Sequence, residues 1–273
     1  MSKSVRRAHS RIERWRLRQV TTLKGLIYQR PRIIFIHIPK TAGTTLRAFL
    51  RSCIGSNSSG RSVGLTDTPF EEPHGEARVR AALTAELVHG HIGWNTIEEI
   101  EPHRGFTFTF LRDPRARIES LYRDLATYSK DIEDPRMQKM VRACEGSTPS
   151  QLAQSRDPVV LAHADNYVVR QLAGNVLDYP VAPTQWPLLT EQALRNLKTL
   201  DYVGRQETFE KDVTDLIRRL NLPRYDCFSR QNASPRSAAP IDVDPALYEW
   251  DLKLYESFMS AKQDPKEAIK LSL

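Results

Sequence analysis

The stretch with the clearest chemical content is residues 33–45, IIFIHIPKTAGTT, where an apolar run ends in small and polar residues. The apolar part predicts a strand buried on both faces, and the residues from Thr44 onward predict a helix. A loop between a strand and a helix N-terminus binds anions, because free backbone N–H groups and the helix dipole point at one spot. Lys40 adds a positive charge, and Gly43 lets the backbone approach a ligand. Hydroxyl donors come from Thr41, Thr44 and Thr45.

This loop differs from the standard nucleotide-binding loop, G-x-x-x-x-G-K-[ST], in which the lysine directly follows the last glycine. Here Lys40 precedes Gly43, and the first glycine is absent. An ordinary ATPase or GTPase is therefore disfavoured. A P-loop-type kinase stays as an alternative that needs a magnesium site, and no Asp-rich metal site is visible. The plain alternative is a capped strand–helix turn with a solvated lysine.

A second strand–helix junction lies at residues 105–122, where the strand GFTFTFL is followed by RDPRARIESLY. Asp113 and Pro114 predict a helix start. Arg112, at the end of the strand, offers a planar fork to a phosphate, and Ser120 offers a hydroxyl. Arg117 lies on the same helix face as Ser120 and is a candidate supporting residue. The alternative is an Arg–Asp pair at a helix start with a surface serine.

A pair of histidines occurs in ELVHGHIGW, residues 86–94. In a strand, His89 and His91 point to the same face. A neutral imidazole with a pKa near 6.5 suits removal of a proton from a hydroxyl group. Either histidine is alternatively a hydrogen-bonded core residue or a metal ligand, although two histidines without a nearby third ligand make a poor zinc site. His37, in the buried first strand, is interpreted as structural.

These three segments, in this order, resemble the sulfotransferases that use 3′-phosphoadenosine 5′-phosphosulfate (PAPS). They are most similar to the branch that includes the Golgi carbohydrate sulfotransferases and heparan sulfate 2-O-sulfotransferase. The resemblance covers roughly residues 32–240. It implies a P-loop-like, three-layer α/β fold, and the alternation of strands and helices independently predicts a mostly parallel sheet flanked by helices.

The resemblance also implies roles for individual residues. His91 is the expected general base and His89 a positioning residue, although which of the two is the base stays open. Lys40 stabilises the bridging oxygen of the donor, Arg112 and Ser120 hold its 3′-phosphate, and no metal is required. The 5′-phosphate is held by the backbone of Thr41, Ala42, Gly43, Thr44 and Thr45.

Two later segments resemble the family more weakly. They are NYVVRQLAG, with Asn166 and Arg170, and RQNASPRS, with Asn232, Ser234 and Arg236 in a loop that would close over the nucleotide. A polar helix face and a surface loop explain them equally well.

The rest of the chain predicts further elements of one domain over residues 31–273. Residues 54–75 predict a loop and residues 129–190 a mostly helical region with proline breaks. The other predicted elements are a helix at Glu76–Ala82, a strand at Glu86–His91, a strand near Tyr202, a helix at Thr208–Leu220 and a last helix capped by Asp244.

The net charge of +7 arises in residues 1–30, which hold nine basic residues against Glu13 alone. The remainder is nearly neutral, which weakens the interpretation of the protein as a nucleic-acid binder. Residues 1–30 predict a basic tail or amphipathic helix, either solvated or in peripheral contact with a membrane or partner. A scaffold protein with a sulfotransferase-like body is the non-enzymatic alternative.

Cellular context follows from three absences in the sequence. There is no apolar run long enough to span a membrane, no secretory signal, and no paired spacing among Cys53, Cys144 and Cys227. We therefore expect a soluble, cytoplasmic, bacterial relative of the Golgi enzymes that acts on a hydroxyl-bearing acceptor, a saccharide or glycolipid.

Overall fold

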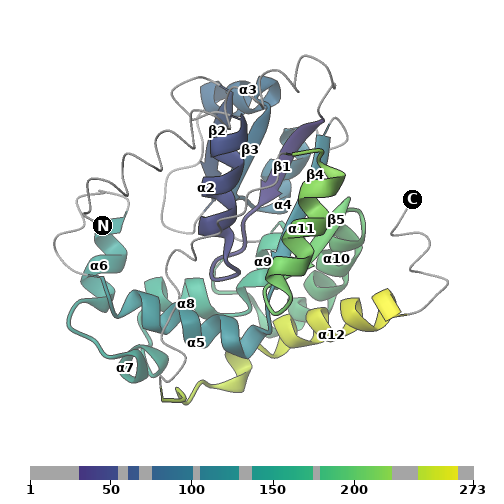
Figure 1. The fold of residues 1–273 in the computed structure, drawn as a ribbon. Helices are drawn as coiled ribbons and strands as arrows, with labels where there is room; N and C mark the ends of the chain where they lie inside the picture. Colours follow the sequence, from purple (N-terminus) through teal and green to yellow (C-terminus); the bar gives the residue numbers. More distant parts are fainter. Residues whose placement is uncertain are drawn as a thin grey trace, which may run out of the picture.

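The protein is described by a computed structural model, which covers residues 31–54, 61–67, 76–100, 105–128, 137–174, 179–222 and 239–263. The predicted basic segment 1–30 and the predicted site residues Asn232 and Arg236 lie outside these ranges. A five-stranded, all-parallel sheet with the order β2-β3-β1-β4-β5 stands at the centre (Figure 1). Its strands are β1 (Arg32–Ile36), β2 (Ser62–Thr66), β3 (Leu87–His91), β4 (Gly105–Leu111) and β5 (Tyr202–Arg205).

Helices cover both faces of the sheet, which confirms the three-layer α/β prediction (Figure 1). One face carries α2 (Gly43–Ile54) and α11 (Phe209–Arg219). The opposite face carries α3 (Glu76–Thr84), α4 (Trp94–Glu99), α9 (Tyr167–Ala173), α10 (Trp186–Lys198) and α12 (Glu249–Gln263). A third hydrophobic core is formed by α5 (Pro114–Leu125), α6 (Gln138–Cys144), α7 (Pro149–Ala153), α8 (Pro158–Ala164) and the 3₁₀ turn η5 (Pro245–Leu247). A second 3₁₀ turn, η4 (Pro183–Gln185), precedes α10.

The strands are buried on both faces because their alternate residues serve two separate cores. In β1, Ile33 and Phe35 pack with α2 and α11, whereas Ile34 and Ile36 pack on the opposite side. Phe35 stacks on Phe108 of the neighbouring β4, with ring centroids 4.8 Å apart. This packing fixes the ends of β1 and β4, where the predicted site residues begin.

Most predicted elements are confirmed, including β4, β5, α11 and the start of α5. The Asp113 side chain accepts a hydrogen bond from the Ala116 backbone N–H at 2.8 Å and caps α5. Asp244 also caps as predicted, but it caps the short turn η5, and the long helix α12 begins only at Glu249.

The predicted loop over residues 54–75 is wrong in part, because Ser62–Thr66 forms strand β2. The sequence SVGLT has a central glycine and weak strand propensity, and its strand exists because β3 supplies a full parallel ladder beside it. Helix α4, at Trp94–Glu99, was not predicted either, since six residues give too little periodicity.

Within the described ranges, no helix has the length and apolarity needed to cross a membrane. Among the same residues, no group of three or more His, Cys, Asp or Glu side chains is placed to hold a metal ion.

Candidate active site

The loop between β1 and α2 has an unusual backbone. Lys40 and Ala42 adopt the left-handed conformation, with φ of 69° and 65°, and Thr41 between them does not. Alternating handedness of this kind turns successive N–H groups toward one concavity, which is an anion-binding arrangement. Left-handed conformations cost non-glycine residues of the order of 1–2 kcal/mol each, so the surrounding structure must hold them.

Two contacts hold this backbone in place. The buried Thr41 hydroxyl donates a hydrogen bond to the carbonyl of Ile38 at 2.8 Å. Gly43 lies so close to His37 that a Cβ at residue 43 would stand 1.9 Å from His37 Cδ2. The Thr41 side chain therefore supports the loop, and the absent side chain of Gly43 leaves room for the imidazole of His37.

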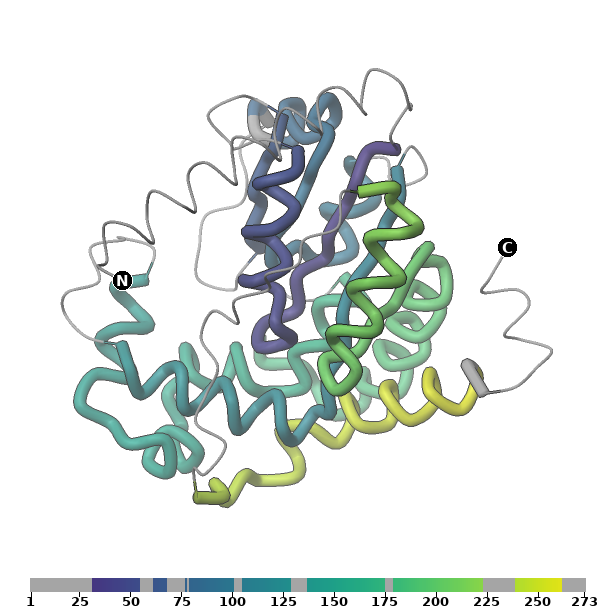
Figure 2. The backbone as a smooth tube through the Cα atoms, viewed as in Figure 1, coloured from purple at the N-terminus to yellow at the C-terminus, as the bar shows by residue number. Residues whose placement is uncertain are grey.

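Lys40 is bound at both ends by residues far away in the sequence. Arg112 donates a hydrogen bond from Nη1 to the carbonyl oxygen of Lys40 at 3.0 Å. The Nζ atom of Lys40 lies 2.9 Å from Oδ1 of Asp124 in α5. The loop after β1 therefore lies against the β4–α5 junction, and Figure 2 shows its bend directed at α5. Asp124 was not singled out in the sequence, although it follows Ser120 by one helical turn.

The β4–α5 junction brings Arg112 and Ser120 to this loop. Arg112 is partly buried, its Nε has no hydrogen-bond partner in the described structure, and burial lowers its pKa. Ser120 is 6% exposed on the face of α5 that also carries Asp124. Lys40 thus contacts Arg112, and it also contacts Asp124, one helical turn after Ser120 on α5.

The predicted histidines lie at the ends of the adjacent strands β1 and β3. The rings of His37 and His91 are 4.3 Å apart between centroids. Nδ1 of His91 is 2.8 Å from the carbonyl oxygen of His37, which accepts only, so Nδ1 carries the proton and Nε2 keeps its lone pair. Burial lowers the pKa of His91 to about 4, although the hydrogen bond to His37 raises it. His91 is therefore neutral and oriented.

His89 differs from His91 in its surroundings. It is 3% exposed, and neither ring nitrogen has a hydrogen-bond partner among the described residues. Burial lowers its pKa to about 4, with further lowering by Arg47 and Arg51. Of the two histidines, only His91 combines partial exposure with a fixed tautomer, which makes it the better candidate for a base.

Gln171 in α9 connects the two histidine-bearing strands and was missed in the sequence. Its Nε2 donates to the carbonyl of His37 at 3.3 Å and to that of Ile92 at 3.0 Å. It therefore fixes the same carbonyl that orients His91. The only feature of the sequence that could have pointed to Gln171 is its position next to Arg170, in a segment that resembles the family.

A comparison with protein families decides the class of this protein. The model described as "Sulfotransferase family" matches residues 26–256. The chain belongs to the sulfotransferase family. A search of the curated proteins gives no match. Sulfotransferases move a sulfuryl group from a donor to an acceptor, so the loop after β1, Arg112 and the neutral His91 lie in an enzyme of that class.

Three other polar residues of this sulfotransferase serve the core. Arg117 is fully buried, with Nη2 3.7 Å from Asp251 Oδ2 and 3.2 Å from the Ala164 carbonyl, so its charge points into the protein. Asn166 accepts a hydrogen bond from Trp250 N at 2.8 Å, and Arg170 donates from Nε to the Asp165 carbonyl at 3.1 Å. The hypothesis that Arg117 supports the phosphate site is therefore corrected, because the ion pair with Asp251 occupies it.

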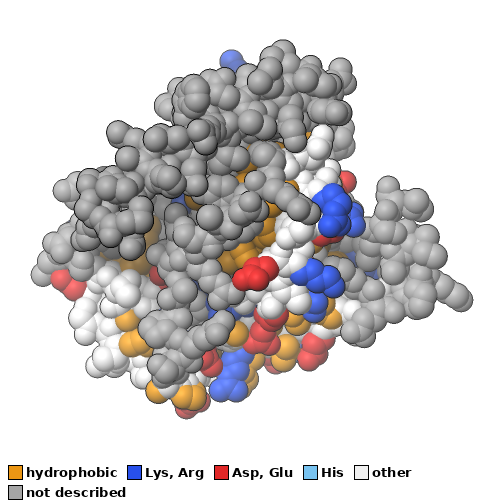
Figure 3. Space-filling model, in the orientation of Figure 1, with side chains coloured by type: hydrophobic (Ala, Val, Ile, Leu, Met, Phe, Trp, Pro, Cys, Tyr) orange, Lys and Arg blue, Asp and Glu red, His pale blue; other side chains and the backbone are white. Residues whose placement is uncertain are grey.

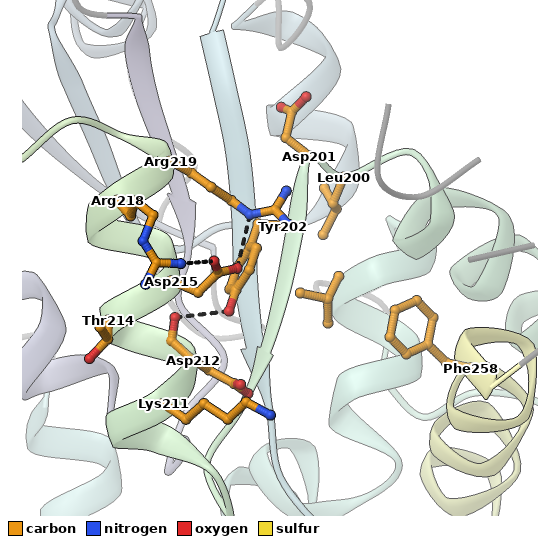
Figure 4. A pocket seen from close by; sticks show the side chains of 11 residues that line it. Leu200, Asp201, Tyr202, Lys211, Asp212, Thr214, Asp215, Arg218, Arg219 and Phe258 are labelled. Atoms are coloured by element: carbon orange, nitrogen blue, oxygen red, sulfur yellow. Dashed lines mark hydrogen bonds and ion pairs between the residues drawn. The ribbon is translucent and has the colours of Figure 1, made fainter. Parts of the chain in front are cut away.

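A pocket of about 440 Å³ lies elsewhere on the sulfotransferase, beside the edge strand β5 (Figure 4). It is lined by β5, α11 and Phe258 of α12, with Tyr202 donating to the Asp212 carbonyl at 2.8 Å. Basic side chains gather along α11 on this side (Figure 3). None of the predicted site residues lines this pocket, so its size does not make it the reaction site.

Proposed function

We propose that this protein transfers the sulfuryl group of PAPS to a hydroxyl group of an acceptor, a carbohydrate or glycolipid. The observation that carries the proposal is the contact between Lys40 and Arg112. It joins a loop suited to a 5′-phosphosulfate to a junction suited to a 3′-phosphate, and PAPS bears both groups whereas ATP lacks the second.

The proposed donor site uses groups of the two strand–helix junctions and of the loop at residues 230–237. The backbone N–H groups of residues 41–45, with the hydroxyls of Thr44 and Thr45, hold the 5′-phosphate. Arg112 and Ser120 hold the 3′-phosphate, and the partnerless Nε of Arg112 fits this role. Asn232 and Arg236 are proposed to close over the nucleotide.

The proposed reaction resembles phosphoryl transfer in its need for in-line positioning and charge neutralisation. The acceptor oxygen attacks sulfur, His91 Nε2 takes the hydroxyl proton, and the bond between sulfur and the 5′-phosphate oxygen breaks. Lys40 stabilises the negative charge on that leaving oxygen, which requires Nζ to leave Asp124. An anionic donor also offsets the cationic surroundings of His91 and raises its pKa toward neutrality.

Nucleotide binding tests the donor assignment. Adenosine 3′,5′-bisphosphate at 100 times its Kd should stabilise the protein by about 2.7 kcal/mol, because it binds only the folded state. ATP with magnesium at the same concentration should have a much smaller effect on Tm. An equal or larger response to ATP would support a kinase instead.

The base is tested separately with His91→Ala. This variant should lose transfer of labelled sulfate from PAPS while it keeps bisphosphate binding nearly intact. Loss of binding in His91→Ala would show a structural role, and full activity would pass the role of base to His89.

A further inference from the structure

The sheet presents an unusually polar surface under one part of α2. On the face that α2 and α11 cover, strands β1 and β4 carry apolar core side chains such as Phe35 and Phe108. Strands β3 and β2 lie beside each other on this face, where His89 pairs with Gly64. Two residues earlier along both strands, Leu87 pairs with Ser62 on the same face. The Ser62 hydroxyl is buried without a hydrogen-bond partner in the described structure. This edge of the sheet is therefore polar where the rest of the face is apolar.

Helix α2 adds two arginines to the same region. Arg47 and Arg51 are one helical turn apart and both are partly buried. Within the part of the chain that the structure describes, neither guanidinium forms a hydrogen bond or ion pair, and Arg51 Nε is buried without a partner. Helix α2 packs against β3, and His89 lies on the α2 face of the sheet, in register with Phe35 of β1. The charges of both arginines lower the pKa of His89, in agreement with this placement.

Like charges one turn apart repel, and buried donors without acceptors destabilise a fold. Burial and the charge of Arg51 both lower the pKa of Arg47, which reflects this repulsion. Among the described residues, no carboxylate is one of the groups that shift the pKa of Arg47 or His89. A cluster of this kind is complete only when an anion supplies the missing acceptors.

We infer that Arg47, Arg51 and His89 form an oxyanion-binding subsite that takes a carboxylate or sulfate group carried by the acceptor. The inference deepens the proposed function, on which it rests, because it makes the acceptor an anionic saccharide. His89 is two residues from His91 along β3, a separation of about 6.6 Å. An anion on His89 therefore sets a hydroxyl of the same or the adjacent sugar near His91.

Sulfate itself is the probe for this subsite. The full chain is saturated with adenosine 3′,5′-bisphosphate and titrated with sodium sulfate, with sodium chloride at equal ionic strength as reference. Tm and the ¹⁵N signals of the histidine rings are followed. We expect a saturable rise in Tm and a shift of the His89 signals with sulfate only. A wild-type protein that responds equally to sulfate and chloride would overturn the subsite.

Variants locate the sulfate. Arg47→Gln/Arg51→Gln should weaken sulfate binding about tenfold or more, since each charge-assisted hydrogen bond is strong. The matched control Arg195→Gln/Arg218→Gln removes two exposed arginines elsewhere and should change nothing. The first variant should melt no lower than wild type without sulfate, because it relieves repulsion. If Arg47→Gln/Arg51→Gln still binds sulfate, or if only Lys40→Met loses sulfate binding, the ion lies at the position of the donor's sulfuryl group. Either result would contradict the inference.

Two further measurements are needed. One tells whether the acceptor carries a carboxylate or a sulfate group, and the other distinguishes failure of the subsite from failure of the proposed function. If the protein binds methyl β-glucuronide more tightly than methyl β-glucoside, the acceptor carries a carboxylate. If it binds sulfate but does not prefer the glucuronide, the acceptor carries a sulfate group. If adenosine 3′,5′-bisphosphate itself does not bind, the proposed function fails. The sulfate titration without nucleotide still reports on His89 in that case.

Discussion

The guanidinium of Arg112 donates a hydrogen bond to the backbone carbonyl of Lys40 at 3.0 Å, across 72 residues of sequence. This bond holds Lys40, one of the two left-handed residues of the loop, while the Nε of Arg112 has no hydrogen-bond partner in the described structure. It also couples the two elements that are proposed to bind the phosphates of the donor, so a change at either should affect the other.

Arg112→Ala should weaken binding of adenosine 3′,5′-bisphosphate by about 1.5–3 kcal/mol, which is about 10- to 150-fold. The loss should be much smaller for adenosine 5′-monophosphate, because that ligand has no 3′-phosphate. Isothermal titration calorimetry measures both. Arg115→Ala, an exposed arginine of α5 paired with Glu119, is the control. Equal losses for the two nucleotides would mean that Arg112 only supports the loop.

Asp124→Asn should tighten bisphosphate binding by up to about fivefold, because binding must otherwise break a partly exposed ion pair that contributes about 0.2–1 kcal/mol. The gain should disappear at high salt and in a Lys40→Met background. Glu119→Gln removes the same charge from the same helix without touching Lys40 and serves as the control. Weaker binding in Asp124→Asn would show that Asp124 holds Lys40 in its working position.

Gly43→Ala should destabilise the protein by about 1–3 kcal/mol and abolish nucleotide binding, because the new Cβ meets the His37 ring. Urea unfolding and calorimetry follow the two effects. In the double variant with His37→Ala, the clash is absent, so much of the stability should return. A double variant no more stable than Gly43→Ala would exclude this contact as the cause.

The free energy of unfolding should fall as the pH drops below 6.5. Burial lowers the folded-state pKa of His37, His89 and His91, so the unfolded chain binds more protons between about pH 4 and 6.5. Each histidine contributes up to about 1.4 kcal/mol per pH unit, and the contribution is complete above pH 6.5. Burial raises the pKa of Asp251, which opposes the trend. Urea titrations of wild type and His89→Gln from pH 4.5 to 7.5 should show a shallower slope in the variant, and identical slopes would contradict the assignment.

Arg117→Leu should cost about 3–5 kcal/mol of stability, because it leaves the Asp251 carboxylate buried without its charge partner. The double variant Arg117→Leu/Asp251→Leu should recover part of that loss. Bisphosphate affinity, measured at a temperature where each variant is folded, should stay the same. A specific loss of affinity would return Arg117 to the phosphate site.

The sequence by itself determined the local chemistry of this protein. The apolar run into PKTAGTT, the Asp113–Pro114 helix start and the period-2 pattern of residues 105–111 each encode one element, because propensity and capping act over a few residues. The order of these motifs was enough to indicate the family that the comparison establishes.

Only the tertiary structure decided which of these groups meet. Placing β3 between β1 and β2 sets His91 against His37 and puts His89 on the face of the sheet that α2 covers. The same sheet order brings Asp124 to Lys40, and it makes a strand of Ser62–Thr66. These contacts depend on strand order and burial across tens of residues, which local periodicity does not encode.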